Sequence, residues 1–468
     1  MADMAPDEPG QADNPFLIRA EWLLFQEQPA EALRAARMGL SLYPDEPGLL
    51  EVAAHCAGLL DGPETAAALW ARLIALHPDA AEPRNERAVQ LARMGSAESA
   101  AAAEAEYREA LRLAPHWASA HSNLGTLLAD LGRDAEAETC FREALALDPD
   151  SAVADKNLGQ LLLAGGRFEE GWARHESRLR EAPPVRVPAD SPCRWWRGEA
   201  LAGKSILVLP EQGLGDEIQF ARYLPWLKAR GAARVTLVCR SSQKALFASL
   251  AGVDDLLALE DEADGLLAAH DYWTLLLSLP FHAGTRADDI PAATPYLKAD
   301  PARVARFAPH LAGDGLKVGL VWRGNPAHSN DRARSLHDPA LLAPLGAVPG
   351  VRFFSLQVPA APPPGGLPCT DLAPLLGDFA DTAAVLAGLD LLISVDTSCA
   401  HLAGALGVAC WLLLPAWRCD WRWQRLREDS PWYPRMRLFR QARMGDWSTP
   451  LARVAQALTA LAADRGLP

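Results

Sequence analysis

The sequence predicts a chain in two parts: an array of paired α-helices in the first third, and an α/β region with two lobes in the rest. Prolines recur at positions 44, 78, 115, 149 and 183, at spacings of 34, 37, 34 and 34 residues. From Gly203 onward, short apolar runs alternate with helical stretches, as in parallel sheets with crossover helices. A polar gap near residues 300–315 divides these runs into two series.

Composition indicates a globular protein of several domains. A length of 468 residues exceeds what one hydrophobic core supports, so two to four domains are expected. Half of the residues are hydrophobic, and the formal net charge is −14. This charge argues against a nucleic-acid-binding protein and against a general binder of membrane surfaces.

Cysteine usage and the N-terminal residues indicate a cytoplasmic protein. The eight cysteines are scattered, with no C-x-x-C pair and no histidine at zinc-binding spacing, so no metal site is expected. A reduced, intracellular setting is the simplest interpretation. The first residues lack the basic and apolar regions of a signal peptide. Since no apolar run approaches the ~20 residues that span a bilayer, no stable membrane insertion is expected.

The changes of pattern give five segments. We predict an acidic, disordered tail at 1–14, a helical repeat array at 15–182, and a proline-rich linker at 183–202. A first α/β lobe is expected at 203–310, and a second at 311–468 that ends in a helix.

The repeat array has a recurring sequence of its own. Two clear copies end at Pro115 and Pro149, and each carries an aromatic residue, Tyr107 or Phe141, between small residues. A period of 34 with small residues at fixed places is typical of tetratricopeptide repeats, which this stretch resembles. Stacked pairs form a curved solenoid whose concave groove usually binds a peptide or partner protein.

Seven apolar runs are the predicted strands. They are 206–209, 235–238 and 273–277 in the first lobe, and 318–322, 351–356, 391–395 and 410–414 in the second. Two such series imply two Rossmann-like lobes. In open parallel sheets, ligands bind at the carboxyl ends of the strands.

The first lobe places a carboxylate after its first strand. The stretch from Pro210 contains two glycines that allow a tight turn, and Asp216 falls where the next helix starts. Asp216 is a candidate general base, although an N-cap is an equally good interpretation of its position. The dinucleotide fingerprint is not met, because Ile218 occupies the third glycine's place. The loop residues assigned to the acceptor side are Gln212, Gly213, Gly215 and Gln219.

The second lobe follows its first strand with an arginine-rich loop. Arg323, Arg332 and Arg334 are candidates to bind a diphosphate, because guanidinium groups hold phosphate oxygens bidentately. A solvated loop is the alternative. The candidates for the nucleotide or sugar are Asn325 in this loop, Gln357 after the next strand, Asp381 and Thr382 at a helix start, and Asp396. Capping is the alternative role at the helix start.

The stretch 390–407 is predicted to be a buried strand, a sharp turn and a helix. Asp396, Thr397 and Ser398 can cap the helix, whose first backbone N–H groups favour an anion such as phosphate. His401 lies within one turn of the same place. The alternative is that Asp396 is only a cap and His401 only a core histidine.

An aromatic segment follows the last predicted strand. Residues 417–434 interleave tryptophans and a tyrosine with arginines and prolines, and could stack on a sugar or a base. Trp421 joins the loop residues assigned to the acceptor side, with core packing as the alternative.

Together, these motifs resemble the heptosyltransferase-like branch of the GT-B glycosyltransferases. The segments that carry the likeness are G-L-G-D-E-I-Q-F-A-R-Y from Gly213, V-D-T-S-C-A-H-L-A-G-A-L-G from Val395, and D-W-R-W from Asp420. The resemblance implies a GT-B fold and inverting transfer from a nucleotide-activated sugar, without an essential metal or a cofactor. It also implies that Asp216 is the base and that the turn at 396–401 holds the donor diphosphate. Arginines replace the lysine that this family uses for donor phosphate.

Our leading hypothesis is a cytoplasmic, bacterial glycosyltransferase whose repeat groove recruits a protein acceptor. One alternative changes the acceptor to a lipopolysaccharide or other glycan precursor. The other is a non-catalytic repeat scaffold with a vestigial nucleotide-binding domain.

Overall fold

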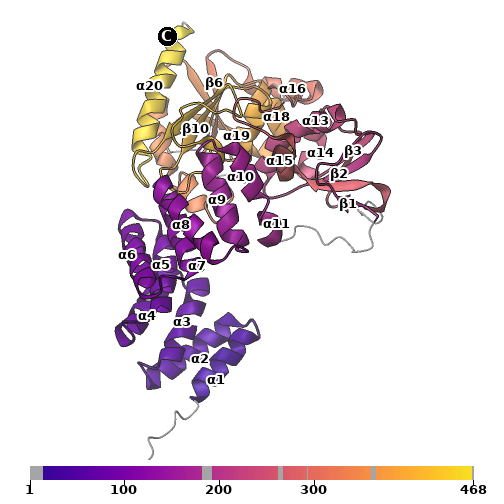
Figure 1. Ribbon diagram of the computed structural model, residues 1–468. Helices are drawn as coiled ribbons and strands as arrows, with labels where there is room; N and C mark the ends of the chain where they lie inside the picture. Colours follow the sequence, from indigo (N-terminus) through magenta and orange to yellow (C-terminus); the bar gives the residue numbers. More distant parts are fainter. Residues whose placement is uncertain (1–13, 182–191, 262–266, 292–293, 360–364, 466–468) are drawn as a thin grey trace, which may run out of the picture. The chain divides into compact units, whose positions relative to one another are not determined.

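The computed structural model describes residues 14–181, 192–261, 267–291, 294–359 and 365–465 (Figure 1). The chain folds as two compact units. Residues up to Ala129, together with Arg133–Ala154, form the first. Asp130–Gly132 and the residues from Asp155 onward form the second. The acidic tail up to residue 13, and residues 182–191 of the predicted linker, lie outside the described residues.

The repeat region consists of antiparallel helix pairs. The helices are α1 (Pro15–Phe25), α2 (Pro29–Leu42), α3 (Pro47–Leu60), α4 (Pro63–Leu76), α5 (Ala81–Met94), α6 (Ala97–Leu113), α7 (Ala118–Asp130), α8 (Asp134–Leu147), α9 (Ala152–Ala164) and α10 (Phe168–His175). The recurring prolines 44, 78, 115 and 149 each follow the end of a helix by two residues. Proline cannot continue a helix, so these positions separate successive pairs.

Small residues allow the two helices of a pair to approach closely. A Cβ added to Gly125 on α7 would lie 2.9 Å from the Phe141 ring on α8. One added to Gly159 on α9 would lie 2.7 Å from the backbone nitrogen of His175 on α10. The glycines of the 34-residue pattern are thus required by packing.

The last repeat helices belong to the second unit. Trp172 on α10 is buried and makes edge contacts with Phe220, Trp421 and Trp432, at ring distances of 6.3, 5.3 and 6.4 Å. After α10, α11 (Arg178–Glu181) carries Arg178, whose guanidinium donates to both carboxylate oxygens of Glu211 at 2.8 and 3.0 Å. The α/β core therefore extends into the final repeat.

The first sheet has five parallel strands. In spatial order they are β1 (Arg194–Trp195), β5 (Tyr272–Leu275), β2 (Ser205–Leu209), β3 (Arg234–Cys239) and β4 (Asp255–Ala258). Its helices include α12 (Leu214–Phe220), α13 (Leu224–Ala229), α14 (Ser241–Phe247) and α15 (Leu279–Ala283). The chain order reverses between β2 and β5, and such a switch point is where open sheets bind ligands.

The second sheet has six parallel strands. They are β11 (Met436–Arg440), β10 (Cys410–Leu414), β9 (Leu391–Val395), β6 (Leu316–Val321), β7 (Val351–Ser355) and β8 (Cys369–Asp371). Its helices are α16 (Pro301–Phe307), α17 (Asp331–Arg334), α18 (Phe379–Ala387), α19 (Ser398–Ala405) and α20 (Ser448–Asp464), which is yellow in Figure 1. Here the order reverses between β6 and β9, so the loops at 322–335 and 396–397 flank the switch point.

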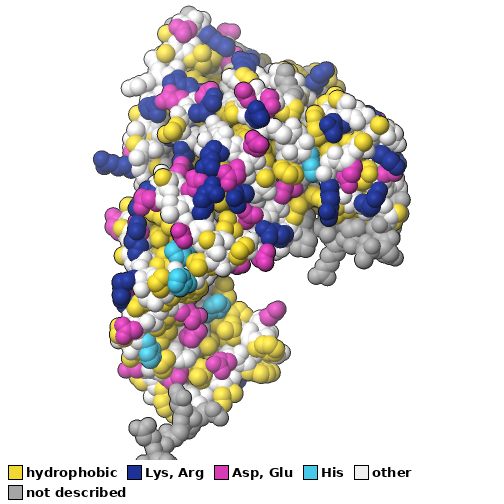
Figure 2. Space-filling model, in the orientation of Figure 1, with side chains coloured by type: hydrophobic (Ala, Val, Ile, Leu, Met, Phe, Trp, Pro, Cys, Tyr) yellow, Lys and Arg dark blue, Asp and Glu magenta, His cyan; other side chains and the backbone are white. Residues whose placement is uncertain are grey.

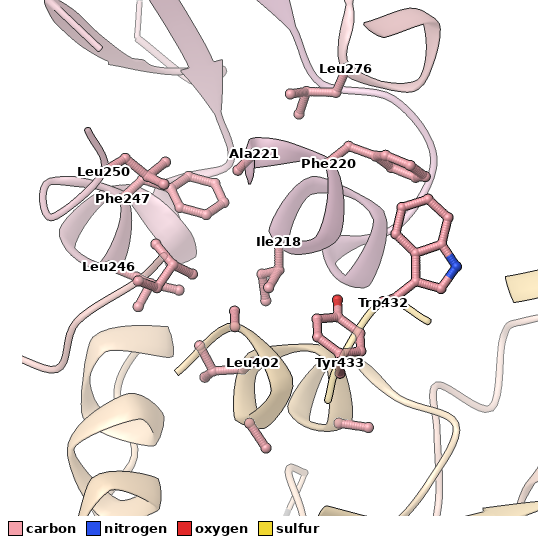
Figure 3. Close-up of a cluster of buried hydrophobic side chains, with 14 of the residues drawn as sticks. Ile218, Phe220, Ala221, Leu246, Phe247, Leu250, Leu276, Leu402, Trp432 and Tyr433 are labelled. Atoms are coloured by element: carbon pink, nitrogen blue, oxygen red, sulfur yellow. The ribbon is translucent and has the colours of Figure 1, made fainter. Parts of the chain in front are cut away.

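One apolar core joins the two lobes. Figure 3 shows Ile218 on α12 pointing toward Leu402 on α19 and toward Tyr433, with Trp432 beside Phe220. All of these side chains are buried. The core fixes α12 of the first lobe against α19 of the second.

The predicted fold class is confirmed: a helical tetratricopeptide-like solenoid precedes an α/β region with two parallel sheets. All seven predicted strands are present. In the described ranges, every helix is too short or too polar to traverse a bilayer. Positive and negative side chains are interspersed over the face shown in Figure 2.

Replacing Trp172 with alanine is expected to destabilise the second unit by about 3 to 5 kcal/mol, since it opens a cavity among buried rings. Residue-level hydrogen exchange in the intact chain would measure this as lost protection in α12 and β11, with α3 and α4 unchanged. Trp70→Ala on α4 is the matched control, because Trp70 is also buried but lies in the first unit. Loss of protection in α3 and α4 alone after Trp172→Ala would contradict the assignment.

Candidate functional site

Asp216 lies in the first turn of α12, directly after the loop that leaves β2. Its Oδ2 accepts a hydrogen bond from the Gly213 backbone N–H at 2.8 Å, so it caps its own helix. Gln212 has a φ of +62°, a left-handed conformation that produces the sharp turn. The Gln212 carbonyl accepts a hydrogen bond from Arg240 at 2.7 Å. The N-cap of α12 is thus Gly213 and not Asp216, which caps the helix from the N3 position. This role leaves Oδ1 for a second partner.

That second partner is Arg422, which reaches Asp216 from the second lobe. Its guanidinium forms an ion pair with Asp216 Oδ1. Nε donates to Gln219 Oε1 at 2.6 Å, and Nη1 donates to Asp420 Oδ2 at 2.8 Å. Arg422 is 5% exposed, so these contacts are shielded from water. Burial raises the pKa of Asp216, and the Arg422 charge opposes that rise.

The turn after β9 presents polar groups at the same place. Thr397 Oγ1 lies 3.0 Å from Ser394 Oγ, and Ser398 begins α19. The backbone N–H groups of Ser398 and Cys399 have no hydrogen-bond acceptor among the described residues. Burial raises the pKa of Asp396 to about 6, and the nearby Asp420 carboxylate adds to the rise.

His401 packs between the lobes. Its Nδ1 lies 3.0 Å from the Tyr433 hydroxyl, and its ring lies 5.2 Å from the Trp423 ring in a tilted arrangement. A Cβ on Gly215 would lie 2.7 Å from its Cδ2, so α12 and α19 meet here. Burial, and then the charge of Arg422, hold the pKa of His401 well below its usual range, which makes the ring neutral. Its Nε2 is 4.0 Å from Asp396 Oδ1, beyond hydrogen-bond distance.

Arg334 is the arginine of the 323–334 loop whose charge acts on Asp396 and His401 of this turn. A Cβ on Gly324 would lie 2.9 Å from its Nη2, so the glycine makes room for the guanidinium. Its buried Nε has no hydrogen-bond partner among the described residues. The Arg334 charge also lowers the pKa values of Asp396 and His401. Arg323 and Arg332 are exposed instead.

We name these five charged groups the interlobe cluster: Asp216, Asp396, Asp420, Arg334 and Arg422. The cluster contains three carboxylates and two guanidinium groups. Its net charge is therefore −1 when every carboxylate is ionised. A proton on Asp396 would bring the cluster to neutrality. Among the described residues, no group of three His, Cys, Asp or Glu side chains could hold a metal ion.

Other predicted site residues have structural partners. Gln357 is buried, and its Oε1 accepts hydrogen bonds from the backbone of Trp322 and Arg323 at 3.1 and 2.9 Å. Asn325 Oδ1 caps the Ala327 N–H at 3.0 Å.

Helix α18 carries two more predicted residues. Asp381 pairs with Arg303 at 2.6 Å and with Arg306, while the Thr382 hydroxyl donates to the Asp378 carbonyl at 3.3 Å. No described hydrogen bond or ion pair links either residue to the interlobe cluster. Trp421 is buried against Trp172 and stacks on the Arg422 guanidinium at 4.5 Å.

Sequence reasoning missed Arg422 and Asp420 as site residues. Both follow β10, whose carboxyl end lies at the same sheet edge as that of β9. The strand-end rule that selected Asp216 and Asp396 could also have selected them.

Comparison with known proteins agrees with the fold. Residues 118–151 match the model of the tetratricopeptide repeat. Protein FlbA of Caulobacter vibrioides is 30% identical over 500 aligned positions, which cover 93% of this chain and 82% of FlbA. The chain belongs to the FlbA family.

Solved structures are similar to part of this FlbA-family chain. TTC0263, a tetratricopeptide protein of Thermus thermophilus, is 26% identical, with a TM-score of 0.32. The match covers 37% of this chain and 93% of that one. YrrB, described as a tetratricopeptide protein with an unusual peptide-binding site, is 18% identical, with a TM-score of 0.31. That match covers 36% of this chain and 86% of YrrB.

Asp396→Asn is expected to stabilise this FlbA-family protein above pH 6. The pKa of Asp396 is raised on folding, so its ionisation costs stability as pH rises through about 6, and asparagine avoids that cost. At pH 8 the gain is at most about 3 kcal/mol, and it vanishes below pH 4. Urea unfolding of both proteins at pH 4 and pH 8 measures it. Asp314→Asn, at an exposed position, is the control. An equal difference between wild type and Asp396→Asn at both pH values would refute this account.

Proposed function

We propose that this protein is an inverting glycosyltransferase that moves a sugar from a nucleotide sugar to an acceptor hydroxyl. The observation that carries the proposal is the meeting of Asp216, from the switch point of the first sheet, with the charged groups at the switch point of the second. A transferase of this type needs a base on one side of the sugar and an anion-binding wall on the other. The interlobe cluster supplies groups of both kinds.

The anion-binding wall is assigned to Arg334 and the first turn of α19. The buried, unpaired Nε of Arg334 and the free N–H groups of Ser398 and Cys399 suit the donor diphosphate. In the reaction, the acceptor oxygen bonds to the anomeric carbon as the bond from that carbon to the phosphate oxygen breaks. Charge grows on the departing nucleoside diphosphate, and these donors stabilise it. Asp216 takes the hydroxyl proton, a contribution of ~10² to 10⁴-fold.

Asp396 makes diphosphate binding sensitive to protonation. An ionised carboxylate beside the turn would repel the donor phosphates, whereas a protonated one would not. Its raised pKa favours the neutral form more than an ordinary aspartate would. The carboxyl group is also suited to hydrogen bonding with a sugar hydroxyl.

The repeats are a protein-interaction module, and we propose that they recruit a polypeptide acceptor. Glu21 on α1, Glu51 on α3, and Glu82 and Glu86 on α5 form no ion pair among the described residues, and burial with the charges of Glu82 and Glu21 raises the pKa of Glu51. By contrast, carboxylates on α6 and α8, such as Glu104, Glu109 and Glu138, pair with arginines. The unpaired carboxylates on α1, α3 and α5 favour an acceptor segment with basic residues.

Asp216→Asn is expected to abolish sugar transfer while donor binding persists, because the amide cannot accept the proton. Wild-type protein incubated with a panel of nucleotide sugars should hydrolyse or transfer from one of them, as followed by release of the nucleoside diphosphate. Full activity of Asp216→Asn would overturn the base assignment. Nucleotide-sugar binding without turnover by the wild type would favour a vestigial scaffold. Transfer to a glycan precursor but to no polypeptide would change the acceptor.

Arg334→Gln is expected to weaken donor binding about 10- to 100-fold, the effect of losing a charge-assisted hydrogen bond. Calorimetric titration with the donor found in the panel measures it. Arg332→Gln is the matched control, because Arg332 lies in the same loop but is exposed. Equal weakening by both substitutions would indicate a general effect of charge and would remove the specific role of Arg334.

A further inference from the structure

Both carboxylate oxygens of Asp216 have partners that limit it as a base. Oδ1 is paired with Arg422, and Oδ2 is bound to the Gly213 N–H. Burial raises the pKa of Asp216, but the Arg422 charge and the Gly213 hydrogen bond both oppose that rise. Loss of the Arg422 partner would therefore make Asp216 a stronger base and would free Oδ1 to accept the proton of a hydroxyl.

One nitrogen of the Arg422 guanidinium, Nη2, can change its partner while the other two keep theirs. Nε is held by Gln219, and Nη1 is held by Asp420, while Nη2 is the arm that contacts Asp216. Gln219 is fully buried, and its Nε2 has no hydrogen-bond partner among the described residues. An unpaired buried donor beside the guanidinium suits an acceptor oxygen from a ligand.

An anion bound at the turn before α19 would compete with Asp216 for Nη2 of Arg422. Arg422 lies close to that turn: the ring of Trp423, the next residue in the chain, is 5.2 Å from the His401 ring, and Gly215, which precedes Asp216, packs against the same imidazole. The Arg422 charge also acts on Asp396 and on His401. A guanidinium group binds phosphate oxygens at least as well as it binds carboxylate oxygens. Entry of a diphosphate therefore offers Arg422 a second anionic partner.

We propose that Arg422 exchanges partners during the reaction: it pairs with Asp216 in the free protein and with the donor diphosphate in the complex. The exchange releases Asp216 as a base only after the donor is bound. This proposal rests on the proposed function, since it assumes that a nucleotide sugar binds the interlobe cluster. It makes Arg422 a catalytic residue that links donor binding to activation of the base.

The test compares nucleoside diphosphate binding by four forms of the full chain: wild type, Arg422→Gln, Asp216→Asn and the double variant. The probes are uridine, guanosine, cytidine and adenosine diphosphate, titrated calorimetrically. Asp216→Asn frees the guanidinium, so it should bind at least as tightly as wild type. Adding Arg422→Gln to Asp216→Asn should then weaken binding tenfold or more, and the weakening should exceed that caused by Arg422→Gln in the wild type.

Folding is controlled in two ways. The double variant removes a cation and an anion together, so it avoids leaving Asp216 unpaired, and its melting temperature is compared with that of Asp216→Asn. Arg422→Lys keeps the positive charge, but its single ammonium group cannot contact Gln219, Asp420 and a phosphate oxygen together. This variant should therefore bind the probe more weakly than wild type even if its melting temperature is unchanged. Arg427→Gln, whose partner is Asp429, should bind like wild type.

Two outcomes overturn the proposal in different ways. If the double variant binds the diphosphate as tightly as Asp216→Asn, Arg422 is only a structural partner of Asp216, and the proposed function is unaffected. If no probe binds any form and no nucleotide sugar is turned over by the wild type, the proposed function fails as well.

Discussion

The close contact between α12 and α19 is the constraint on which the rest of this structure depends. Gly215 and His401 approach so nearly that a side chain at position 215 would collide with the imidazole. Because Gly215 precedes Asp216, and His401 follows the turn at Asp396, this contact brings two strand-end loops together. Each loop comes from the switch point of its own sheet. The contact thereby converts two separate sheet edges into one cluster of charged groups.

Ion pairing balances only part of the charge in that cluster. Asp216 and Asp420 share Arg422, whereas Asp396 and Arg334 have fewer partners. Burying ionised groups costs several kcal/mol each unless they are paired, so an incompletely paired cluster is expensive for stability. Buried ionisable groups that are incompletely paired are common where ligands bind or reactions occur. This cost is the physical reason for proposing that the cluster binds a ligand.

The final repeat contributes to the same region through Trp172 and Arg178. Trp172 packs on Trp421, the neighbour of Arg422, and Arg178 pairs with Glu211 in the loop that leads to Asp216. The α/β unit therefore needs the last repeat helices to complete its core and to fix both loops.

Much of the fold could be predicted from the sequence, because its signals are local. The proline period gave the helix pairs, and the apolar runs gave seven strands. The strands that were missed are short or alternate with charges, as in Arg437 and Arg440 of β11, so no continuous apolar run marks them. Asp216, Asp396 and Arg334 were selected as candidates because they follow strands. Arg422 also follows a strand, but its pairing with Asp216 could not be predicted, because the two residues lie 206 positions apart in the chain. The ion pairs of Asp381 with Arg303 and Arg306 were hidden for the same reason.

The most direct test of the central claim is hydrogen exchange of the intact protein with and without each nucleotide sugar of the panel. One site built by two lobes predicts slower exchange in the loop before α12 and in the first turn of α19 together, with the same dependence on ligand concentration. The account would be contradicted if only one lobe were protected, or if the two lobes became protected at different ligand concentrations.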